Sequence, residues 1–243
     1  MPAVKVRFLP AGDTALVVEF GREIDRAVSD QVLALRTRLD KARLAGVVEL
    51  VATFRSLMVH YDPLRTSNAR LTSAIRELLQ GNHAEAREAR LWRIPACYED
   101  QHAPDLADVA KRSGLATEEV IARHAGTRYH VYMIGFVPGY PYMGDLPEAL
   151  RLPRRTDPRV RVPAGSVAIA ANMTGIYPVE SPGGWHLIAS TPVRLFDPAL
   201  ARPALLSPGD VVAFEPVSAS EHDKLRRRIH AGEWQVPSEV IKA

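Results

Sequence analysis

Prolines gather near the middle of this chain, and they limit its fold more than any other sequence feature. Six of the 19 prolines lie within residues 138–163. Each proline removes a backbone hydrogen-bond donor and fixes φ, so this segment is predicted to be neither a helix nor a central strand. Ordered segments of this length without regular structure are uncommon in compact domains and often serve as binding loops. The sequence therefore predicts a long, stiff loop here.

The first eighty residues alternate between two hydrophobic periods. Apolar residues repeat at every second position, the period of half-buried strands, in residues 4–8, 16–20, 48–52 and 57–61. They step by three or four in residues 24–42 and 71–79, which indicates two helices. Gly46 is expected to end the first helix, and Ser67 is expected to cap the second. This order predicts a small α+β sandwich over residues 1–81, with an antiparallel or mixed sheet covered on one face.

A polar break at residues 81–85 is the expected boundary to a second domain, which spans residues 82–243. Glycine is the usual residue just after the end of a helix, and it suggests two short helices early in this domain. The expected helices are residues 105–113 ended by Gly114, and a helix capped by Thr117 and ended by Gly126.

Many short strands are expected in the rest of the chain. They fall at residues 91–95, 129–137, 165–171, 185–189, 193–196 and 211–215. Gly/Pro turns separate them, and Pro208-Gly209 suits the two central positions of a type II turn. Short strands joined by such turns are typical of a barrel or a sandwich. The predicted fold class is therefore α+β.

Composition narrows the classes of function. The net charge is +3, and the basic residues are spread along the chain apart from Arg226–Arg228, which are expected on the solvated side of a helix over residues 220–230. No basic stripe interleaved with aromatics points to nucleic acid. No apolar run is long enough to span a membrane, and the N-terminus lacks a secretion signal. Cys97 is the single cysteine, expected to be a small buried thiol, so no internal disulfide forms and the cytoplasm is the expected compartment.

The chain lacks the motifs of a self-sufficient enzyme. It contains no phosphate loop, no dinucleotide fingerprint, no H-E-x-x-H pair and no cysteine cluster, so no metal site is expected. It also contains no G-x-S-x-G elbow. Ser166 and Ser181, expected in loops, are predicted to satisfy local backbone groups instead of forming a hydrolase triad. No catalytic residue is assigned from the sequence.

Two segments suggest a ligand site. Residues 135–144 place aromatic side chains on a stiff backbone, which binds ligands at low entropic cost, although these rings could equally plug one end of a barrel. Residues 166–186 contain adjacent glycines that allow close backbone approach, although a tight turn explains them as well. Arginines between the two segments can clamp a carboxylate or make ordinary surface ion pairs. The candidate binding residues are Tyr140 and Tyr142 as an apolar wall, Gly183 and Gly184 as backbone donors, Arg159 and Arg161 as clamps, and the hydroxyls of Ser166, Thr174 and Ser181.

Five blocks in one order resemble a known family. They are residues 131–142 (VYMIGFVPGYPY), 153–155 (PRR), 161–169 (RVPAGSVAI), 174–178 (TGIYP) and 181–185 (SPGGW). The chain resembles the family of allophanate hydrolase subunit 1, which includes the B subunit of bacterial 5-oxoprolinase and the kinase inhibitor KipI. The resemblance covers essentially the whole chain and is strongest over residues 129–214. Tyr140 stands where phenylalanine is frequent, and Asn172-Met173 where smaller or more polar pairs are common; both departures bear on ligand preference.

The resemblance implies a C-terminal cyclophilin-like β-barrel behind the small α+β domain. It implies a non-autonomous subunit of an ATP-dependent 5-oxoprolinase, which converts 5-oxoproline, ATP and water to glutamate, ADP and phosphate. The implied partners are a protein like allophanate hydrolase subunit 2 (PxpC) and a PxpA-like subunit, and ATP is expected to bind with their help. The alternatives are a KipI-like inhibitor of a sensor histidine kinase and a subunit of allophanate hydrolase or urea carboxylase. Fold alone does not choose among these functions.

Overall fold

The computed structural model describes residues 6–80 and 88–242, and it divides the chain into two compact units. The first unit lies within residues 1–87, and the second spans residues 88–241. The predicted boundary at residues 81–85 lies outside the described residues. None of the helices in the described ranges combines the length and the apolar character that crossing a membrane would require.

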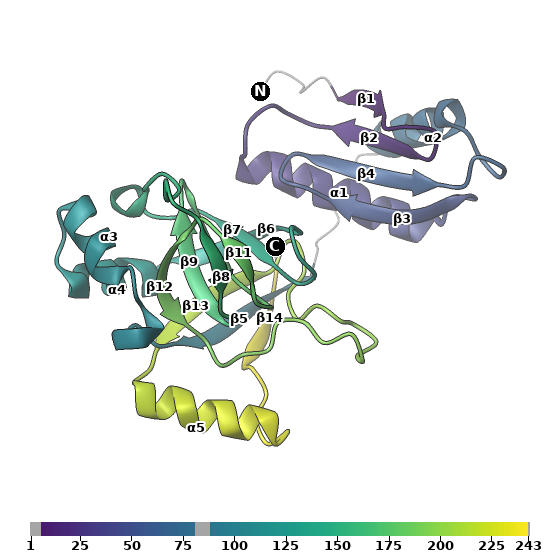
Figure 1. Cartoon of the computed structure of the whole chain (residues 1–243). Helices are drawn as coiled ribbons and strands as arrows, with labels where there is room; N and C mark the ends of the chain where they lie inside the picture. Colours follow the sequence, from purple (N-terminus) through teal and green to yellow (C-terminus); the bar gives the residue numbers. More distant parts are fainter. Residues whose placement is uncertain (1–5, 81–87, 243) are drawn as a thin grey trace. The chain divides into compact units, whose positions relative to one another are not determined.

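The first unit is one antiparallel sheet with both helices on one face, as the sequence predicts (Figure 1). The sheet order is β1-β2-β4-β3. Its elements are β1 (Arg7–Pro10), β2 (Ala15–Glu19), α1 (Arg26–Ala42), β3 (Val47–Ala52), β4 (Ser56–Tyr61) and α2 (Asn68–Gln80). A buried apolar cluster that includes Leu16, Leu35 and Leu57 joins the helices to the sheet. The α+β class predicted from the alternating periods is therefore correct.

Helix ends in this unit follow local chemistry. Asp25 caps α1, because its carboxylate accepts a hydrogen bond from the Val28 amide at 3.1 Å. Gly46 does not end this helix as predicted. Arg43 takes the left-handed conformation at φ 44° instead, and its amide donates to the Leu39 carbonyl. The predicted Ser67 cap is confirmed by the hydrogen bond from the Arg70 amide to the Ser67 hydroxyl at 3.3 Å.

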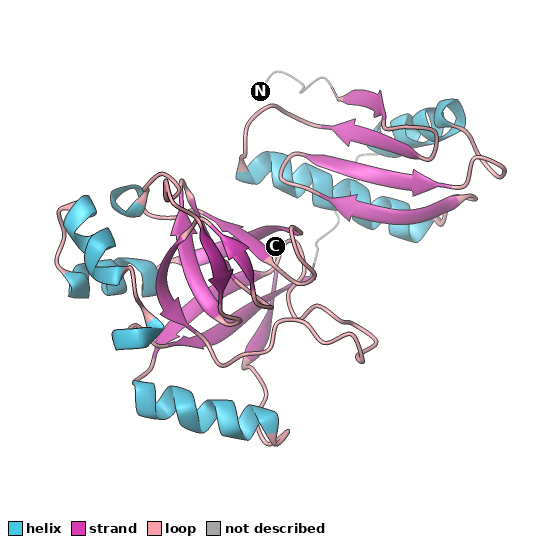
Figure 2. Ribbon diagram, viewed as in Figure 1, coloured by secondary structure: helices cyan, strands magenta, loops and turns pink. Residues whose placement is uncertain are grey.

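The second unit is built on an eight-stranded sheet of order β12-β9-β10-β7-β6-β13-β5-β14, and β8 and β11 form a separate pair. Figure 2 shows its helices lying around the strands. Its strands are β5 (Glu88–Ala96), β6 (Arg128–Ile134), β7 (Pro141–Gly144), β8 (Arg159–Val162), β9 (Ser166–Ala170), β10 (Met173–Ile176), β11 (Ser181–Gly183), β12 (His186–Ser190), β13 (Val211–Pro216) and β14 (Ser238–Lys242). Its helices are η1 (Asp100–His102), α3 (Leu106–Ser113), α4 (Thr117–Ala125), η2 (Glu148–Leu150) and α5 (Ala219–His230).

The large sheet curls strongly. Cys97, directly after β5, exchanges backbone hydrogen bonds of 2.8 and 2.9 Å with Ser190 at the end of β12. Two strands that stand far apart in the sheet order therefore meet at this one bridge. The curled sheet encloses a core that includes Ile94, Ile169 and Val212. Cys97 is fully buried, as the sequence predicts.

Several details of the second unit differ from the prediction. β7 lies within the proline-rich segment and between β10 and β6, although a central strand was not expected there. Pro141 is the first residue of β7, so the missing amide falls at the strand end and the following residues supply the donors. Residues 193–196 form no strand, only a single bridge from Phe196 to Ala204. Ala116, not Thr117, is the N-cap of α4.

Other local predictions for this unit are correct. Gly114 ends α3 in the left-handed conformation. Gly209 has φ 96°, and the Asp210 amide donates to the Ser207 carbonyl at 3.0 Å, which is the predicted type II turn. The Asp210 carboxylate also accepts from the Trp92 indole at 2.9 Å, so this turn is tied to β5.

Candidate functional site

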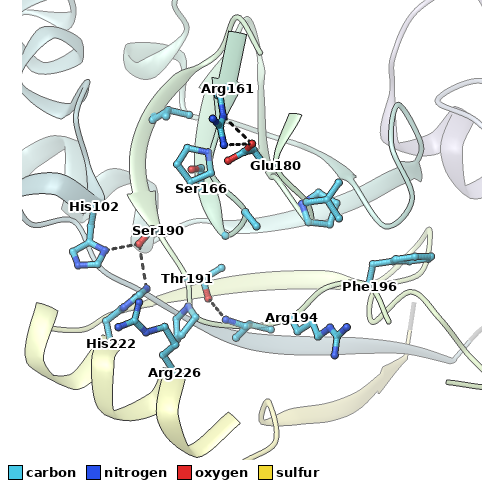
Figure 3. Close-up of a pocket in the computed structure, with 18 of the residues that line it drawn as sticks. His102, Arg161, Ser166, Glu180, Ser190, Thr191, Arg194, Phe196, His222 and Arg226 are labelled. Carbon is cyan, nitrogen blue, oxygen red and sulfur yellow. Dashed lines mark hydrogen bonds and ion pairs between the residues drawn. The ribbon is translucent and has the colours of Figure 1, made fainter. Parts of the chain in front are cut away.

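A cavity of the second unit has a volume of about 1020 Å³ (Figure 3). It is walled by η1, β8, the start of β9, β12 with the loop that follows it, and α5. Figure 3 shows His102, Ser190 and His222 on one side of it, and Arg161 paired with Glu180 on another. Segments from residue 101 to residue 226 thus contribute to one cavity.

A serine hydroxyl lies between two imidazoles in this cavity. The Ser190 Oγ is 2.7 Å from the His102 Nδ1 and 3.2 Å from the His222 Nε2. The two rings are tilted with centroids 4.4 Å apart. Burial lowers the pKa of His222, the neighbouring His102 lowers it further, Asp223 acts in the opposite direction, and Arg226 adds the smallest lowering effect. His222 is therefore neutral at neutral pH.

Arginines also line the larger cavity, and each has a carboxylate partner. Arg161 pairs with Glu180 through two nitrogens, at 2.8 and 2.9 Å, and both side chains are largely exposed. Arg194 pairs with Asp197 at 2.9 Å, and Arg226 pairs with Asp223 at 3.0 Å. A guanidinium carries five N–H donors, so one carboxylate leaves donors for a ligand.

Arg159 is used differently, because it binds the buried carboxylate of Asp105. The two side chains form a bidentate pair with distances of 2.6 and 2.8 Å. Asp105 also accepts from Arg155 at 3.1 Å and from the Leu187 amide at 2.7 Å. This network ties β8 to the start of α3 and to β12. Arg159 therefore positions the cavity wall in this structure.

A second, smaller cavity of about 300 Å³ is walled by aromatic rings. Tyr140 lies at the centre of this aromatic cluster, and its ring centroid is 5.0 Å from that of Tyr142, 5.1 Å from that of Tyr177 and 6.0 Å from that of Trp185. Burial raises the pKa of Tyr140 well above its usual value, although the nearby Arg154 acts in the opposite direction. The hydroxyl of Tyr140 thus stays protonated at any ordinary pH.

Glycines make room for these rings. A Cβ on Gly183 would overlap the hydroxyl of Tyr177, and a Cβ on Gly175 would overlap that of Tyr140. Phe136 stands at the same cavity with its side chain exposed and φ at 68°, a conformation that is rare for an aromatic residue. Strained, exposed residues gather at ligand sites.

The structure separates the residues that the sequence groups into one site. Tyr140, Tyr142, Gly183 and Gly184 line the smaller cavity, whereas Arg159, Arg161 and Ser166 line the larger one. Thr174 and Ser181 line neither of these cavities. Ser166 and Ser181 begin strands β9 and β11, so the prediction that they lie in loops is wrong.

Thr174 is a core residue with a structural partner. Its hydroxyl donates to the Ala168 carbonyl at 3.1 Å, so it accepts from the His124 Nε2 at 3.0 Å. The His124 Nδ1 in turn accepts from the Tyr98 hydroxyl at 2.8 Å. Burial lowers the pKa of His124 to about 3, and the network holds the ring neutral. Ser181 is also buried, and its hydroxyl has no hydrogen-bond partner among the described residues.

Sequence reasoning missed the three residues at the centre of the larger cavity. His102 and Ser190 are 88 positions apart, and Ser190 and His222 are 32 apart. No local motif surrounds any of them. The pairing of the chain after β5 with the end of β12 brings them together, and hydrophobic periodicity does not predict such a pairing.

Comparison with known proteins identifies the family. A family model described as carboxyltransferase domain, subdomain C and D, matches residues 6–206. The chain belongs to this family. It is 36% identical to the B subunit of 5-oxoprolinase from Bacillus subtilis over 230 residues, covering 90% of this chain and 96% of that protein. It is 40% identical to the B subunit of 5-oxoprolinase from Escherichia coli O157:H7, covering 84% and 93% of the two chains. The resemblance inferred from the five blocks is therefore confirmed.

Solved structures place the same fold inside longer chains. The crystal structure of TTHA0988 is 38% identical with a TM-score of 0.75, and this chain covers 40% of that chain. The K. lactis urea amidolyase is 21% identical with a TM-score of 0.80, and this chain covers 16% of it. The first of these shares sequence and fold, and the second shows the fold alone. The carboxyltransferase-domain architecture thus occurs both as a separate chain and as part of larger proteins.

Proposed function

We propose that this chain is the B subunit of an ATP-dependent 5-oxoprolinase, which opens the lactam ring of 5-oxoproline to form glutamate. The observation that carries the proposal is the 36–40% identity to proteins of that name over nearly their whole length. The chain is proposed to act with a partner like allophanate hydrolase subunit 2 and with a third, PxpA-like subunit. That TTHA0988 carries this fold within a chain of greater length supports a role beside further domains.

The larger cavity is the proposed site of 5-oxoproline. It brings together titratable groups and arginines, and a lactam that carries a carboxylate needs both. Arg161 is the proposed carboxylate clamp, because it is exposed and retains donors beyond its pair with Glu180. Ser166 is the proposed hydroxyl contact, and Arg159 holds the wall through Asp105.

The smaller cavity is the proposed contribution of this chain to the ATP site. The partly exposed ring of Tyr142, backed by the buried rings of Tyr140 and Trp185, is a surface on which a flat base can pack, and Arg154 carries a positive charge in the same cavity. Gly184 permits close approach of the backbone, whereas the Tyr177 hydroxyl fills the space beside Gly183. A volume of about 300 Å³ accepts a base and leaves the phosphates for groups of the partner chains.

Two finer features belong to the same proposal. The curled sheet of the second unit is proposed to be a cyclophilin-like β-barrel, supported by the bridge between Cys97 and Ser190. The cytoplasm is the proposed compartment, supported by a single, buried cysteine. Both are consistent with a metabolic role.

Reconstitution tests the function. The tagged chain is purified from its own cells, its companions are identified, and ADP release is measured with and without 5-oxoproline. Two oxoprolinase-type partners and release that depends on 5-oxoproline would support the proposal. Capture of a histidine kinase without this activity would overturn it in favour of the inhibitor alternative.

Matched variants then assign the cavities. Arg161→Ala in the assembled complex should raise the KM for 5-oxoproline at least tenfold, and Gly184→Ala should change the KM for ATP. Unchanged affinity for both substrates in folded variants would refute the assignment.

A further inference from the structure

The cluster around Ser190 joins three separate elements of the second unit. His102 ends η1, Ser190 ends β12, and His222 lies on α5 (Figure 3). All three residues line the larger cavity. His222 is buried, whereas His102 and Ser190 are only partly buried and remain open to the cavity. The hydroxyl between two imidazoles is therefore in reach of whatever the cavity holds.

The direction of these hydrogen bonds follows from proton counting. The Nδ1 of His222 is buried without a hydrogen-bond partner among the described residues, and the Asp223 Oδ1 lies 4.0 Å away. A carboxylate on that side favours the tautomer with the proton on Nδ1. The Nε2 of His222 then accepts the hydrogen bond that the single hydroxyl proton of Ser190 donates.

The remaining bond must run in the same direction. Because the Ser190 hydroxyl donates its hydrogen bond to His222, its oxygen accepts a hydrogen bond from the protonated Nδ1 of His102. The Nε2 of His102 is then a lone pair, and it has no hydrogen-bond partner among the described residues. The hydrogen bonds thus run from His102 to Ser190 and from Ser190 to His222, and Asp223 lies beyond His222. A proton that arrives at one end can shift along this line.

The charges around the line suit proton uptake. Arg226 and Asp223 face His222 from α5, and they pair with each other at 3.0 Å. His102 faces it from η1, and Glu99 just before η1 binds the Ala219 amide at the start of α5. The pKa of His222 is lowered first by burial and then by His102, so the His222 ring can begin the cycle neutral. Asp223 is placed to stabilise the cation that forms when a proton arrives.

We propose that His102 is the general base of the larger cavity and that Ser190 and His222 form the proton relay behind it. The inference rests on the proposed function, and its substrate is the water that opens a carboxylate-bearing lactam. The water oxygen bonds to the lactam carbonyl carbon as its proton passes to the Nε2 of His102. The C–N bond breaks, and the ring nitrogen keeps the electron pair and takes that proton back, which leaves an amine and a carboxylic acid; the cleavage of ATP to ADP and phosphate is a separate step that needs groups of the partner chains.

Spectroscopy of the histidine tautomers tests the relay without a measurement of enzyme activity. The full chain labelled with ¹⁵N at histidine is expected to show His222 as a neutral ring, and both rings with a proton on Nδ1, at pH 7.5. Ser190→Ala is expected to shift the ring signals of both histidines, whereas Ser220→Ala, an exposed serine on the same helix as His222, should leave them unchanged. A charged His222, a proton on its Nε2, or unchanged signals in Ser190→Ala would overturn the relay.

Kinetics of the assembled complex tests the role in catalysis. Ser190→Ala should lower kcat about 10- to 100-fold with little change in the KM for 5-oxoproline, because general-base catalysis contributes about 100-fold or more. Ser190→Thr, which keeps the hydroxyl, should recover most of the rate, and Ser220→Ala should match the parent. Normal kcat in Ser190→Ala would overturn the proposal. If the parent complex shows no turnover of 5-oxoproline, the proposed function fails, and the tautomer spectra decide the relay independently.

Discussion

The carboxylate of Asp105 should be among the most sensitive single groups in the second unit. It is buried and accepts four hydrogen bonds, two from Arg159, one from Arg155 and one from the Leu187 amide. Asp105→Ala removes all four, and it leaves a buried amide and two guanidinium groups without their acceptor. Breaking a buried ion pair from one side costs about 3 to 5 kcal/mol, and an unsatisfied buried amide costs about 1 to 3 kcal/mol.

Hydration of the two arginines recovers part of this lost free energy. The side chains of Arg155 and Arg159 are 27% and 26% exposed, so both can rehydrate. We therefore expect Asp105→Ala to lower the unfolding free energy of the second unit by about 3 kcal/mol, towards the lower end of these ranges. For a unit of this size that corresponds to a fall in Tm of about 6 to 12 °C.

Tryptophan fluorescence isolates the relevant unit. All three tryptophans, Trp92, Trp185 and Trp234, lie within residues 88–241, so urea unfolding followed by their emission reports the second unit. The control is Glu180→Ala, which breaks the exposed pair with Arg161 and should cost no more than about 1 kcal/mol. A loss below about 1 kcal/mol for Asp105→Ala, or equal losses in the two variants, would refute the reasoning.

Three further outcomes follow from the same structure. Burial lowers the pKa of His124 to about 3 from an unfolded value near 6.5, so stability that is full above pH 6.5 is lost as the pH falls towards 3. Urea unfolding at stepped pH should show this group contributing up to about 1.4 kcal/mol per pH unit in that window, and a slope equally steep in His124→Gln would contradict it. Gly183→Ala should lower the unfolding free energy by about 1 to 3 kcal/mol because its Cβ overlaps Tyr177, whereas Gly184→Ala, with no atom nearer than 3.6 Å, should behave like the parent in thermal unfolding. Cys97 should react with a thiol reagent only when the second unit unfolds, and rapid labelling of the native chain would show that this thiol is accessible.

Local sequence chemistry predicted most elements of the fold. Hydrophobic period separated the helices from the strands of the first unit, because one buried face imposes a period of its own on each kind of element. Pro208-Gly209 predicted its turn because few residues accept a positive φ. The failures have equally local causes. Arg43, not Gly46, ends α1. Pro141 can belong to a central strand because it is the first residue of β7.

The two cavities show where sequence reasoning stops. Candidate residues were grouped because they are close in the chain, yet Arg161 and Gly184 line different cavities. Thr174 was a candidate by its hydroxyl, and the sheet directs it into the core against His124. Strand alternation assigns a face to each residue, but it does not say which cavity that face meets.

The sequence by itself determined the α+β class, the family and the absence of familiar phosphate and zinc motifs, because period, composition and short motifs are properties of neighbouring residues. Only the tertiary structure decided that His102, Ser190 and His222 meet around one hydroxyl. Their meeting depends on the bridge between Cys97 and Ser190, which curls the sheet, and on the docking of α5. Such contacts join residues tens of positions apart, and they arise when the whole sheet closes over its core.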